Sequence, residues 1–250
     1  MPATQDKPLR DQVALVTGAG RRIGRTIALT LARAGADVVV NYNRSRAEAQ
    51  AAVREIAALG VRTAALRADV SKTRQIEAMF GALEKRFGQL DILVNNAAVF
   101  FPRAWGELAE GDWDRILGIN LKGTFFCAQA AARLMIQRKR GAIINISSLG
   151  GLQAWPGYMH YCCSKAAVIM LTRCLAKALA PHIRVNSVAP GTILFAGEER
   201  RGVIKNAIRT TPLQKSGRAE DIADAVLFLT TQADFITGQV FAVDGGKSIS

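Results

Sequence analysis

A tyrosine and a lysine four residues apart form the pair in this sequence that is best suited to acid–base chemistry. Tyr161 and Lys165 fall within residues 158–177, whose pattern predicts a helix. Residues four apart lie on one helical face, with their Cβ atoms about 5–6 Å from each other. A lysine ammonium beside a phenol favours the phenolate and lowers the tyrosine pKa from its usual value of about 10. We therefore expect Tyr161 to act as a general acid near neutral pH.

A serine hydroxyl precedes this pair by thirteen residues. Ser148 follows an apolar run, residues 142–146, that predicts a buried strand. A hydroxyl at the end of that strand would hold the substrate oxygen that Tyr161 protonates. The alternative is a surface helix in which Tyr161 and Lys165 are incidental, so the other motifs of the chain must decide.

The length and composition of the chain predict one α/β domain over residues 1–250. The sequence has 250 residues, of which 50% are hydrophobic, enough for a large core. No apolar run approaches the length of a membrane span, and residues 1–12 lack the apolar run of a signal peptide. We expect a soluble, cytoplasmic protein with no membrane partner.

The net charge of +13 is compatible with a nucleic acid, an acidic protein or a polyanionic cofactor as partner. However, the arginines are scattered, with no long basic run and little aromatic interleaving. We expect a solvated basic surface and no nucleic-acid partner. The four cysteines match neither a disulfide framework nor a zinc pattern, so we expect no metal site, and Cys162 and Cys163 to be small buried hydrophobes.

Short apolar runs alternate with helical patterns along the chain. The predicted strands are residues 13–17, 38–41, 61–68, 92–94, 142–146, 183–188 and 240–243. The predicted helices are residues 23–34, 47–59, 72–87 with Ser71 as N-cap, 112–119, 121–137, 158–177 and 221–230. This alternation predicts βαβ units and a parallel sheet covered on both faces. Residues 192–212 carry a charged GEERRG run with weak periodicity, and we expect them to form a mobile substrate flap.

A glycine-rich loop joins the first predicted strand to the first predicted helix. Gly18, Gly20 and Gly24 lie there, in the context where glycines let the backbone approach a pyrophosphate at a helix N-terminus. Because the loop has both the strand before it and the helix after it, it predicts a dinucleotide site.

The residues after the second strand indicate which dinucleotide binds. A site for NAD usually has an acidic residue about 20 positions after the loop, and residues 38–42 contain none. Arg44 and Ser45 follow directly, and Arg21 and Arg22 lie in the loop. Positive charge and hydrogen-bond donors suit a 2′-phosphate, so we expect NADP(H). A solvated helix start would explain Arg44 alone.

Small and polar residues end the third and fourth strands. Asp69 and Val70 end the third strand, where we expect the adenine. Asn96, Ala97 and Ala98 end the fourth strand and leave room for a ribose, because ligands of open α/β sheets bind at the carboxyl ends of the strands. An aspartate near a helix start and an asparagine in a turn also have purely structural explanations.

In this order and spacing, the motifs resemble those of the short-chain dehydrogenase/reductase family over residues 13–246. The matching elements are the loop 17–24, residues 95–98, Asn120, Ser148, Tyr161 and Lys165, the Pro190-Gly191 turn and the terminal Asp244-Gly245-Gly246. The resemblance implies a Rossmann-like, doubly wound parallel sheet of seven strands with helices on both faces. It also implies a homo-oligomer, commonly a tetramer built through helices 121–137 and 158–180 and the last strand.

The resemblance further implies a catalytic tetrad of Asn120, Ser148, Tyr161 and Lys165. Tyr161 would be the acid/base, Ser148 would polarise the substrate oxygen, Lys165 would bind the nicotinamide ribose and Asn120 would hold a proton-relay water. The residues expected to bind the cofactor are Thr17, Gly18, Gly20, Arg21, Arg22, Ile23, Gly24, Asn43, Arg44, Ser45, Asp69, Val70, Asn96, Ala97, Ala98, Tyr161, Lys165, Pro190, Gly191 and Thr192. The residues expected to contact the substrate are Phe100, Ser148, Tyr158 and Phe195.

Several residues depart from the common family pattern. Arg22 stands where the loop usually has glycine, Phe195 stands where a threonine often contacts the nicotinamide, and Ala98 replaces the glycine of NNAG. The Arg22 loop is typical of pteridine reductases within the family, whose surroundings Phe100 and Tyr158 also resemble. Pteridine reductases usually have an aspartate at the position of Ser148.

We therefore expect an NADPH-dependent reductase of a ketone or 3-oxoacyl substrate. The alternative is a pteridine reductase, and a third interpretation is a non-catalytic NADP-sensing protein. Acyl carrier protein is a candidate partner, since Arg138, Lys139 and Arg140 resemble the basic docking site of 3-oxoacyl reductases. The loop of the second basic contact is shortened to Pro181-His182, and a basic helix end also suits the helix dipole.

Overall fold

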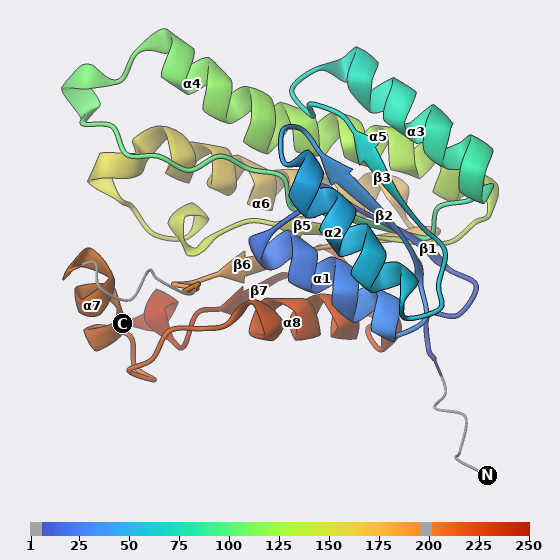
Figure 1. The fold of residues 1–250 in the computed structure, drawn as a ribbon. Coiled ribbons are helices and arrows are strands. Elements are labelled where there is room, and N and C mark those ends of the chain that lie inside the picture. The colour runs from blue at the N-terminus through green and yellow to red at the C-terminus, as the bar shows by residue number, and fades with distance from the viewer. Residues whose placement is uncertain (1–6, 196–201) are drawn as a thin grey trace.

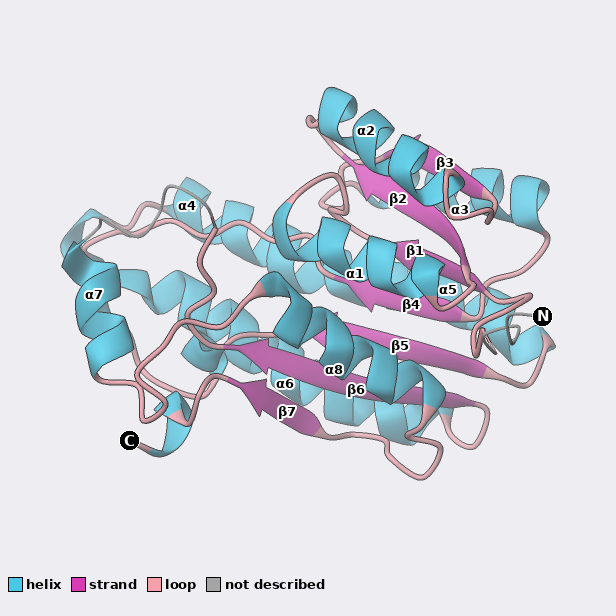
Figure 2. Cartoon of the chain, turned by 60° about the horizontal axis from the view of Figure 1, so that its bottom comes forward, coloured by secondary structure: helices cyan, strands magenta, loops and turns pink. Residues whose placement is uncertain are grey.

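A seven-stranded parallel sheet forms the centre of the protein (Figures 1 and 2). This computed structural model describes residues 7–195 and 202–250. The strands are β1 (Val13–Val16), β2 (Asp37–Tyr42), β3 (Thr63–Arg67), β4 (Ile92–Asn95), β5 (Gly141–Ile146), β6 (Ile183–Pro190) and β7 (Val240–Val243). Their spatial order is β3-β2-β1-β4-β5-β6-β7, so the chain reverses direction across the sheet between β1 and β4. The predicted doubly wound sheet is confirmed.

Helices cover both faces of this sheet (Figure 2). The helices are α1 (Arg22–Arg33), α2 (Arg46–Ala57), α3 (Thr73–Phe87), α4 (Glu110–Leu117), α5 (Gly123–Gln137), α6 (Met159–Leu179), α7 (Gly202–Arg209) and α8 (Ala219–Thr231). Because strand side chains alternate between faces, Ala14 and Val16 pack with α1, α2 and α8 in one core. Val13 and Leu15 pack with α3, α5 and α6 in the other core.

Two predicted helix boundaries are wrong. Helix α3 has Lys72 as its N-cap, because the Ser71 hydroxyl donates a hydrogen bond of 2.7 Å back to Asp69. The predicted helices 112–119 and 121–137 are joined by a π-helical turn, Gly118–Lys122, instead of being separated. Single π-helical turns often occur at functional sites.

The predicted flap, residues 192–212, contains helix α7, which the sequence pattern did not predict. Its residues 196–201 lie outside the described part of the chain. A bridge pairs Ile193, near the start of the predicted flap, with Gly217, and the amide of Gly217 donates to the Thr192 carbonyl oxygen at 3.0 Å.

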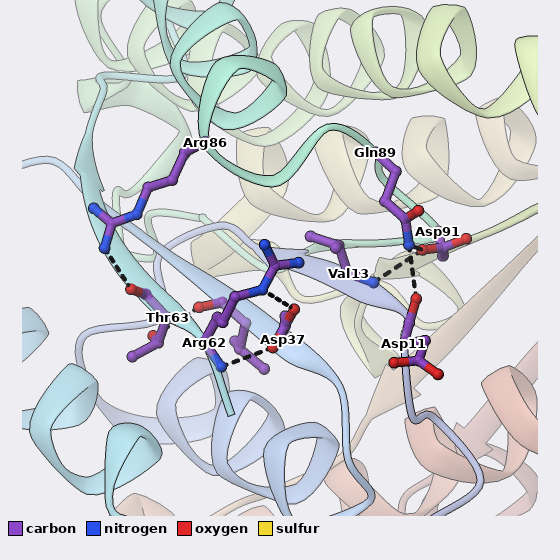
Figure 3. Close-up of polar contacts among 9 residues, drawn as sticks. Asp11, Val13, Asp37, Arg62, Thr63, Arg86, Gln89 and Asp91 are labelled. Atoms are coloured by element: carbon purple, nitrogen blue, oxygen red, sulfur yellow. Dashed lines mark hydrogen bonds and ion pairs between the residues drawn. The ribbon is translucent and has the colours of Figure 1, made fainter. Parts of the chain in front are cut away.

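Polar contacts fix the amino-terminal edge of the sheet (Figure 3). The Asp91 carboxylate accepts hydrogen bonds of 2.9 Å from the amide of Val13 and from Gln89. Asp37 forms an ion pair of 2.6 Å with Arg62. These contacts lie at the edge opposite the predicted site and stabilise the start of the strands.

Three expectations, about the cysteines, a membrane span and a metal site, can be compared with the structure. Cys162 is half-buried and Cys163 is exposed on α6, so the prediction that both are buried is wrong. Among the described residues, no helix is both long and apolar enough to cross a membrane. The same residues contain no cluster of three or more histidine, cysteine or acidic side chains that would hold a metal.

Candidate active site

The residues predicted to form a site follow the carboxyl ends of successive strands. Since all strands are parallel, these ends lie along one edge of the sheet. The residues brought to this edge are Thr17 and Gly18 after β1, Asn43 to Ser45 after β2, Asp69 and Val70 after β3, Asn96 to Ala98 after β4, Ser148 after β5, and Gly191 and Thr192 after β6.

Hydrogen bonds fix the glycine loop between β1 and α1. The amide of Gly18 donates to Asn41 Oδ1 at 3.1 Å, and Gly18 has a φ of +64° that favours glycine. Thr17 Oγ1 accepts from the amides of Asn96 and Ala97 at 2.9 and 3.0 Å. The loop after β1 is therefore tied to the ends of both neighbouring strands.

Gly24 lies where the packing of the loop leaves no room for a side chain. A Cβ at this position would lie 2.4 Å from Asn96 Nδ2 and 2.6 Å from the carbonyl oxygen of Gly18. Gly24 therefore lets α1 approach the β1 and β4 ends closely, which is a different role from admitting a phosphate.

The N-terminal end of α1 is suited to an anion. Arg21 is the N-cap, its side chain makes no capping hydrogen bond, and the first turn contains no acidic residue. The first amides of a helix and its dipole attract negative charge. The loop and helix thus fit a dinucleotide pyrophosphate without any competing carboxylate in that turn.

Arg22 and Phe195 contact each other across the site. The Arg22 guanidinium carbon lies 4.1 Å from the centroid of the Phe195 ring, a cation–π geometry. Arg22 has a φ of +55°, the conformation for which glycine is the usual residue. The contact joins a residue expected to bind the cofactor to one expected to contact the substrate.

The residues after β2 and β3, where the adenine is expected, are more exposed. Arg44 is exposed and Ser45 is the N-cap of α2. Asp69 is partly buried, which raises its pKa, but hydrogen bonds from Ser71 and Asn43 outweigh this and keep the pKa below its usual value. The aspartate is therefore ionised and oriented by its neighbours.

Tyr161 and Lys165 are both buried on α6. Lys165 Nζ donates a hydrogen bond of 2.7 Å to the Ile146 carbonyl oxygen and lies 5.9 Å from the centroid of the Tyr161 ring. Burial lowers the pKa of Lys165 to about 8. Burial raises the pKa of Tyr161 to about 12, although a hydrogen bond with Ser148 opposes the rise. The expected lowering of the tyrosine pKa is therefore wrong for the protein chain alone.

Ser148 lies between the end of β5 and Tyr161. Its hydroxyl accepts a hydrogen bond of 3.1 Å from the amide of Gly150 and lies close enough to the Tyr161 phenol to oppose the rise of its pKa. Only 6% of the Ser148 surface and 9% of the Tyr161 surface is exposed. The two hydroxyl groups are adjacent and together can hold one oxygen atom of a bound molecule.

Asn120 occupies the π-helical turn between α4 and α5. Its Oδ1 accepts from the amide of Val99 at 2.9 Å, and its Nδ2 donates to Val99 O and Ser164 Oγ, each at 3.1 Å. The Ser164 hydroxyl in turn donates to the Tyr161 carbonyl oxygen at 2.7 Å. The Asn120 side chain thus joins the loop after β4 to the helix that carries Tyr161.

Aromatic rings surround Tyr161. Phe100 stacks on Tyr158 with a centroid distance of 4.5 Å and meets Tyr161 edge-on at 4.7 Å. The Trp155 ring lies nearly parallel to that of Tyr161 at 6.3 Å. Phe100 is 55% exposed, so this aromatic wall borders the opening of the site.

Comparison with known proteins shows which family this sequence and fold match. A family model described as Enoyl-(Acyl carrier protein) reductase matches residues 18–248. The 3-oxoacyl-[acyl-carrier-protein] reductase FabG of Staphylococcus aureus strain Mu50 is 43% identical over 237 residues, 93% of this chain and 96% of the relative. A short-chain type dehydrogenase/reductase from Mycobacterium marinum has a TM-score of 0.91 and 35% identity, covering 98% of both chains. The chain belongs to the short-chain dehydrogenase/reductase family.

A further structure of this family contains a bound nucleotide. The gluconate 5-dehydrogenase of Burkholderia cenocepacia J2315, in complex with NADP and tartrate, has a TM-score of 0.91 and 34% identity, with 98% of each chain covered. As a member of the family, the present chain is an oxidoreductase acting on CH–OH or C=O groups.

Sequence reasoning missed several residues at the site of this short-chain reductase. Asn41 was counted only as a non-acidic residue, yet it binds the Gly18 amide and donates to the Ala68 carbonyl oxygen at 3.2 Å. Ser164 and Trp155 were also missed. A serine adjacent to Lys165 and a tryptophan six residues before Tyr161 were the available signals, but both contacts depend on the folded loops.

Proposed function

We propose that the protein is an NADPH-dependent reductase that protonates a carbonyl oxygen of its substrate through Tyr161. The observation that carries this proposal is the adjacency of the Ser148 and Tyr161 hydroxyls at the end of β5, beside buried Lys165. Two hydroxyl donors around one oxygen position suit a carbonyl that gains negative charge during reduction.

In this mechanism Tyr161 donates its proton to the substrate oxygen. Its pKa of about 12 keeps the phenol protonated throughout the neutral range. Ser148 would donate a second hydrogen bond and orient that oxygen, and charged Lys165 would stabilise the tyrosinate left after proton transfer. Asn120 would position α6 through Ser164. The Ser164 hydroxyl accepts a hydrogen bond from the Asn120 side chain and donates one to the Tyr161 carbonyl oxygen.

The glycine loop and the α1 N-terminus fit a dinucleotide cofactor. A bound nicotinamide dinucleotide supplies the hydride for the reduction. We propose that Gly18, Gly20 and the first amides of α1 hold its pyrophosphate, with Asp69 and Val70 beside the adenine and Asn96 to Ala98 beside a ribose. The Pro190-Gly191 turn and Thr192 would border the nicotinamide, at the end of β6.

We propose a preference for NADP over NAD. The end of β2 has no carboxylate to repel a 2′-phosphate, and exposed Arg44 follows it directly with Asn43 and Ser45 beside it. A guanidinium binds a phosphate through charge-assisted hydrogen bonds. The structure of the Burkholderia cenocepacia relative, which is a complex with NADP, is compatible with this choice.

For the substrate we propose a ketone or 3-oxoacyl compound first. The Staphylococcus aureus relative is named as a 3-oxoacyl reductase, and Ser148 suits a carbonyl oxygen. A pteridine reductase is the second candidate, because Phe100, Tyr158 and Arg22 are present. However, the Phe100 ring stacks on Tyr158 and the Arg22 guanidinium lies over the Phe195 ring. The two groups that would suit a pterin are thus in contact with other side chains, which is why the pteridine reductase ranks second.

The basic residues after α5 are partly neutralised by the protein itself. Arg140 donates two hydrogen bonds of 2.9 and 3.0 Å to Asp91, and Arg138 lies 3.9 Å from the same carboxylate. We therefore propose small-molecule substrates first. Acyl carrier protein remains the candidate protein partner, tested by salt-dependent binding to the wild type and to Lys139→Glu.

We also propose a homotetramer. Phe125 on α5 and Met170 on α6 are 37% and 54% exposed, and Leu117, Leu121 and Leu171 line a groove beside Phe125. An exposed apolar face of this kind marks a protein contact. Light scattering should give about four times the chain mass of 26.9 kDa, and a monomer mass would contradict the proposal.

The decisive experiment is Tyr161→Phe, assayed by NADPH oxidation with diketones, an acetoacetyl thioester and aromatic ketones. The variant keeps the ring but loses the proton donor, so NADPH binding should persist while turnover falls by a factor on the order of 10²–10⁴. Near-normal turnover in the variant would reject Tyr161 as the acid. If the wild type binds NADPH but oxidises it neither with any carbonyl compound nor with dihydrobiopterin, the non-catalytic NADP-sensing interpretation is supported.

A further inference from the structure

The C-terminal tail, residues 244–250, contacts two segments, one between Ser148 and Tyr161 and the other directly after α7. The Lys247 carbonyl oxygen accepts a hydrogen bond of 2.8 Å from Gln153 Nε2, a residue 94 positions earlier. The Lys247 ammonium donates a hydrogen bond of 2.9 Å to the Thr210 carbonyl oxygen. One residue therefore joins two parts of the chain that are distant in sequence.

The first of these parts is the wall segment, residues 149–158, between Ser148 and Tyr161. It carries Trp155, whose ring lies parallel to Tyr161, and Tyr158, which stacks on Phe100. The segment folds closely around the indole, since a Cβ at Gly150 would lie 2.9 Å from the Trp155 ring. Gln153 lies in this segment, so its hydrogen bond to Lys247 links the segment that carries these rings to the tail.

The second part is the flap base, residues 210–213, which follows α7. The amide of Leu213 donates to the Gly245 carbonyl oxygen at 3.1 Å, and only 4% of Thr211 is exposed. A Cβ at Gly245 would lie 2.8 Å from Thr211 Cγ2. The flap base therefore packs directly on the tail.

The tail itself is anchored beside the expected nicotinamide position. The Asp244 carboxylate accepts from the amides of Gly246 and Ser248 at 2.9 and 2.6 Å. A Cβ at Gly191 would lie 2.7 Å from the Asp244 Cα, so the tail touches the turn that ends β6. The tail is thus fixed at its start and holds the wall segment on one side and the flap base on the other.

We propose that Gln153 and Lys247 are positioning residues that set the spacing between the wall segment and the flap base, and so the size of carbonyl substrate that is accepted. The inference rests on the proposed reductase function and adds a specificity determinant to it. Neither residue touches the reacting atoms. Their loss should weaken the binding of large substrates and leave the chemical step unchanged.

The contact is tested first without catalysis, by hydrogen exchange of the cofactor-free protein. Gln153→Glu keeps the side-chain size but replaces the donor amide with a carboxylate facing the Lys247 carbonyl, whereas Gln153→Lys keeps a donor. We expect several-fold faster exchange in residues 149–158 and at Leu213 for Gln153→Glu and for deletion of residues 247–250. Gln153→Lys should stay close to the wild type. The matched control is Gln12→Glu, since the only hydrogen bond of the Gln12 side chain among the described residues is the one of 3.5 Å to Pro8, before β1.

The specificity role is tested by kinetics with two probes of different size, butanedione and an acetoacetyl thioester of N-acetylcysteamine. For the thioester, Gln153→Glu and the deletion should each raise KM about tenfold, the scale of one lost hydrogen bond. The values of kcat and of KM for butanedione should change less than about twofold. Because the deletion already removes the contact of Gln153 with Lys247, adding Gln153→Glu to it should raise KM no further than the deletion alone.

Each outcome decides one proposal. Unchanged exchange in Gln153→Glu, or KM effects that multiply in the combined variant, would overturn the positioning role. Equal KM increases for both probes would also overturn it, because a general distortion affects small and large substrates alike. If the wild type reduces neither probe nor any other carbonyl compound, the proposed reductase function fails instead, and the exchange result still decides whether the contact holds the two segments.

Discussion

Lys165 and Tyr161 share one face of α6, but the lysine ammonium donates its hydrogen bond to Ile146 at the end of β5, 2.7 Å away. Its nitrogen lies 5.9 Å from the centroid of the phenol ring. Burial shifts the two pKa values in opposite directions, to about 8 for the lysine and about 12 for the tyrosine. Both shifts disfavour the charged form, so desolvation outweighs the attraction between the pair.

Lys165→Met should stabilise the fold and abolish function. A pKa lowered from 10.5 to about 8 corresponds to a destabilisation on the order of 3 kcal/mol at pH 7, where the buried ammonium is charged. The loss of one hydrogen bond to Ile146 offsets part of the gain, about 1 kcal/mol. We expect Tm to rise by several degrees at pH 7, with turnover lost.

The pH dependence of the Tm gain in Lys165→Met shows whether the buried lysine charge causes it. The unfolded lysine keeps its proton up to its ordinary pKa of 10.5, whereas the folded one releases it above about 8. Wild-type stability therefore rises relative to the variant between these values, and the Tm difference should shrink at pH 9.5. Lys177→Met, an exposed lysine on the same helix, is the control and should change Tm little. A lower Tm for Lys165→Met would contradict the argument.

His160 should make the protein sensitive to mild acid. Its side chain is fully buried, neither ring nitrogen has a hydrogen-bond partner, and the ring meets Phe101 edge-on at 4.9 Å. Burial lowers its pKa below 6.5, with Arg103 adding to the shift and Asp112 opposing it. The unfolded chain therefore binds more protons below pH 6.5, so folded stability is lost as pH falls through that value.

The measurement for His160 is Tm at pH 7.5 and 5.5. We expect His160→Phe, which keeps a ring against Phe101, to lose less Tm on acidification than the wild type. His182→Phe changes the other histidine of the chain and should leave the wild-type acid sensitivity intact. Equal acid sensitivity of the wild type and His160→Phe would show that other groups cause it.

The sheet could be predicted because each strand is indicated by the few consecutive residues that form it. Each buried parallel strand is a short apolar run, and the glycine after α3 that ends this helix, Gly88, has the expected left-handed φ of +76°. Helix α7 was missed, because the charged GEERRG run directly before it favoured a flap over a regular element. The π-helical turn at Asn120 was missed because its extra residue keeps the helix continuous.

The site residues were predicted by type, but their electrostatics were not. The pKa of Tyr161 depends on burial by Phe100, Trp155 and the loop after β5, which come from separate parts of the chain. Spacing places a lysine near a tyrosine but says nothing about the carbonyl of Ile146 that holds the ammonium. Contacts such as Gln153 with Lys247 leave no pattern in the sequence at all.

Arg44→Asp should change the choice of coenzyme. The substitution removes a charge-assisted contact with the 2′-phosphate, worth roughly 1.5–3 kcal/mol, and adds repulsion. We expect kcat/KM for NADPH to fall at least tenfold while that for NADH changes much less. Arg54→Asp, in the last turn of α2, is the charge-matched control and should alter neither. Equal losses with both coenzymes would mean that Arg44 does not read the 2′-phosphate.

Ser148 should separate the two candidate substrate classes. Because its hydroxyl lies beside that of Tyr161, where we propose that the carbonyl oxygen binds, Ser148→Ala should reduce ketone turnover on the order of 10²-fold, the scale of a lost oxyanion donor. Ser147→Ala removes the neighbouring hydroxyl, which donates to Val188 in β6, and should change turnover far less. Phe100→Ala should mainly raise KM for flat substrates, because stacking binds them without taking part in proton transfer. If the wild type reduces dihydrobiopterin much faster than any ketone, and Ser148→Asp accelerates it further, the pteridine reductase is the correct assignment.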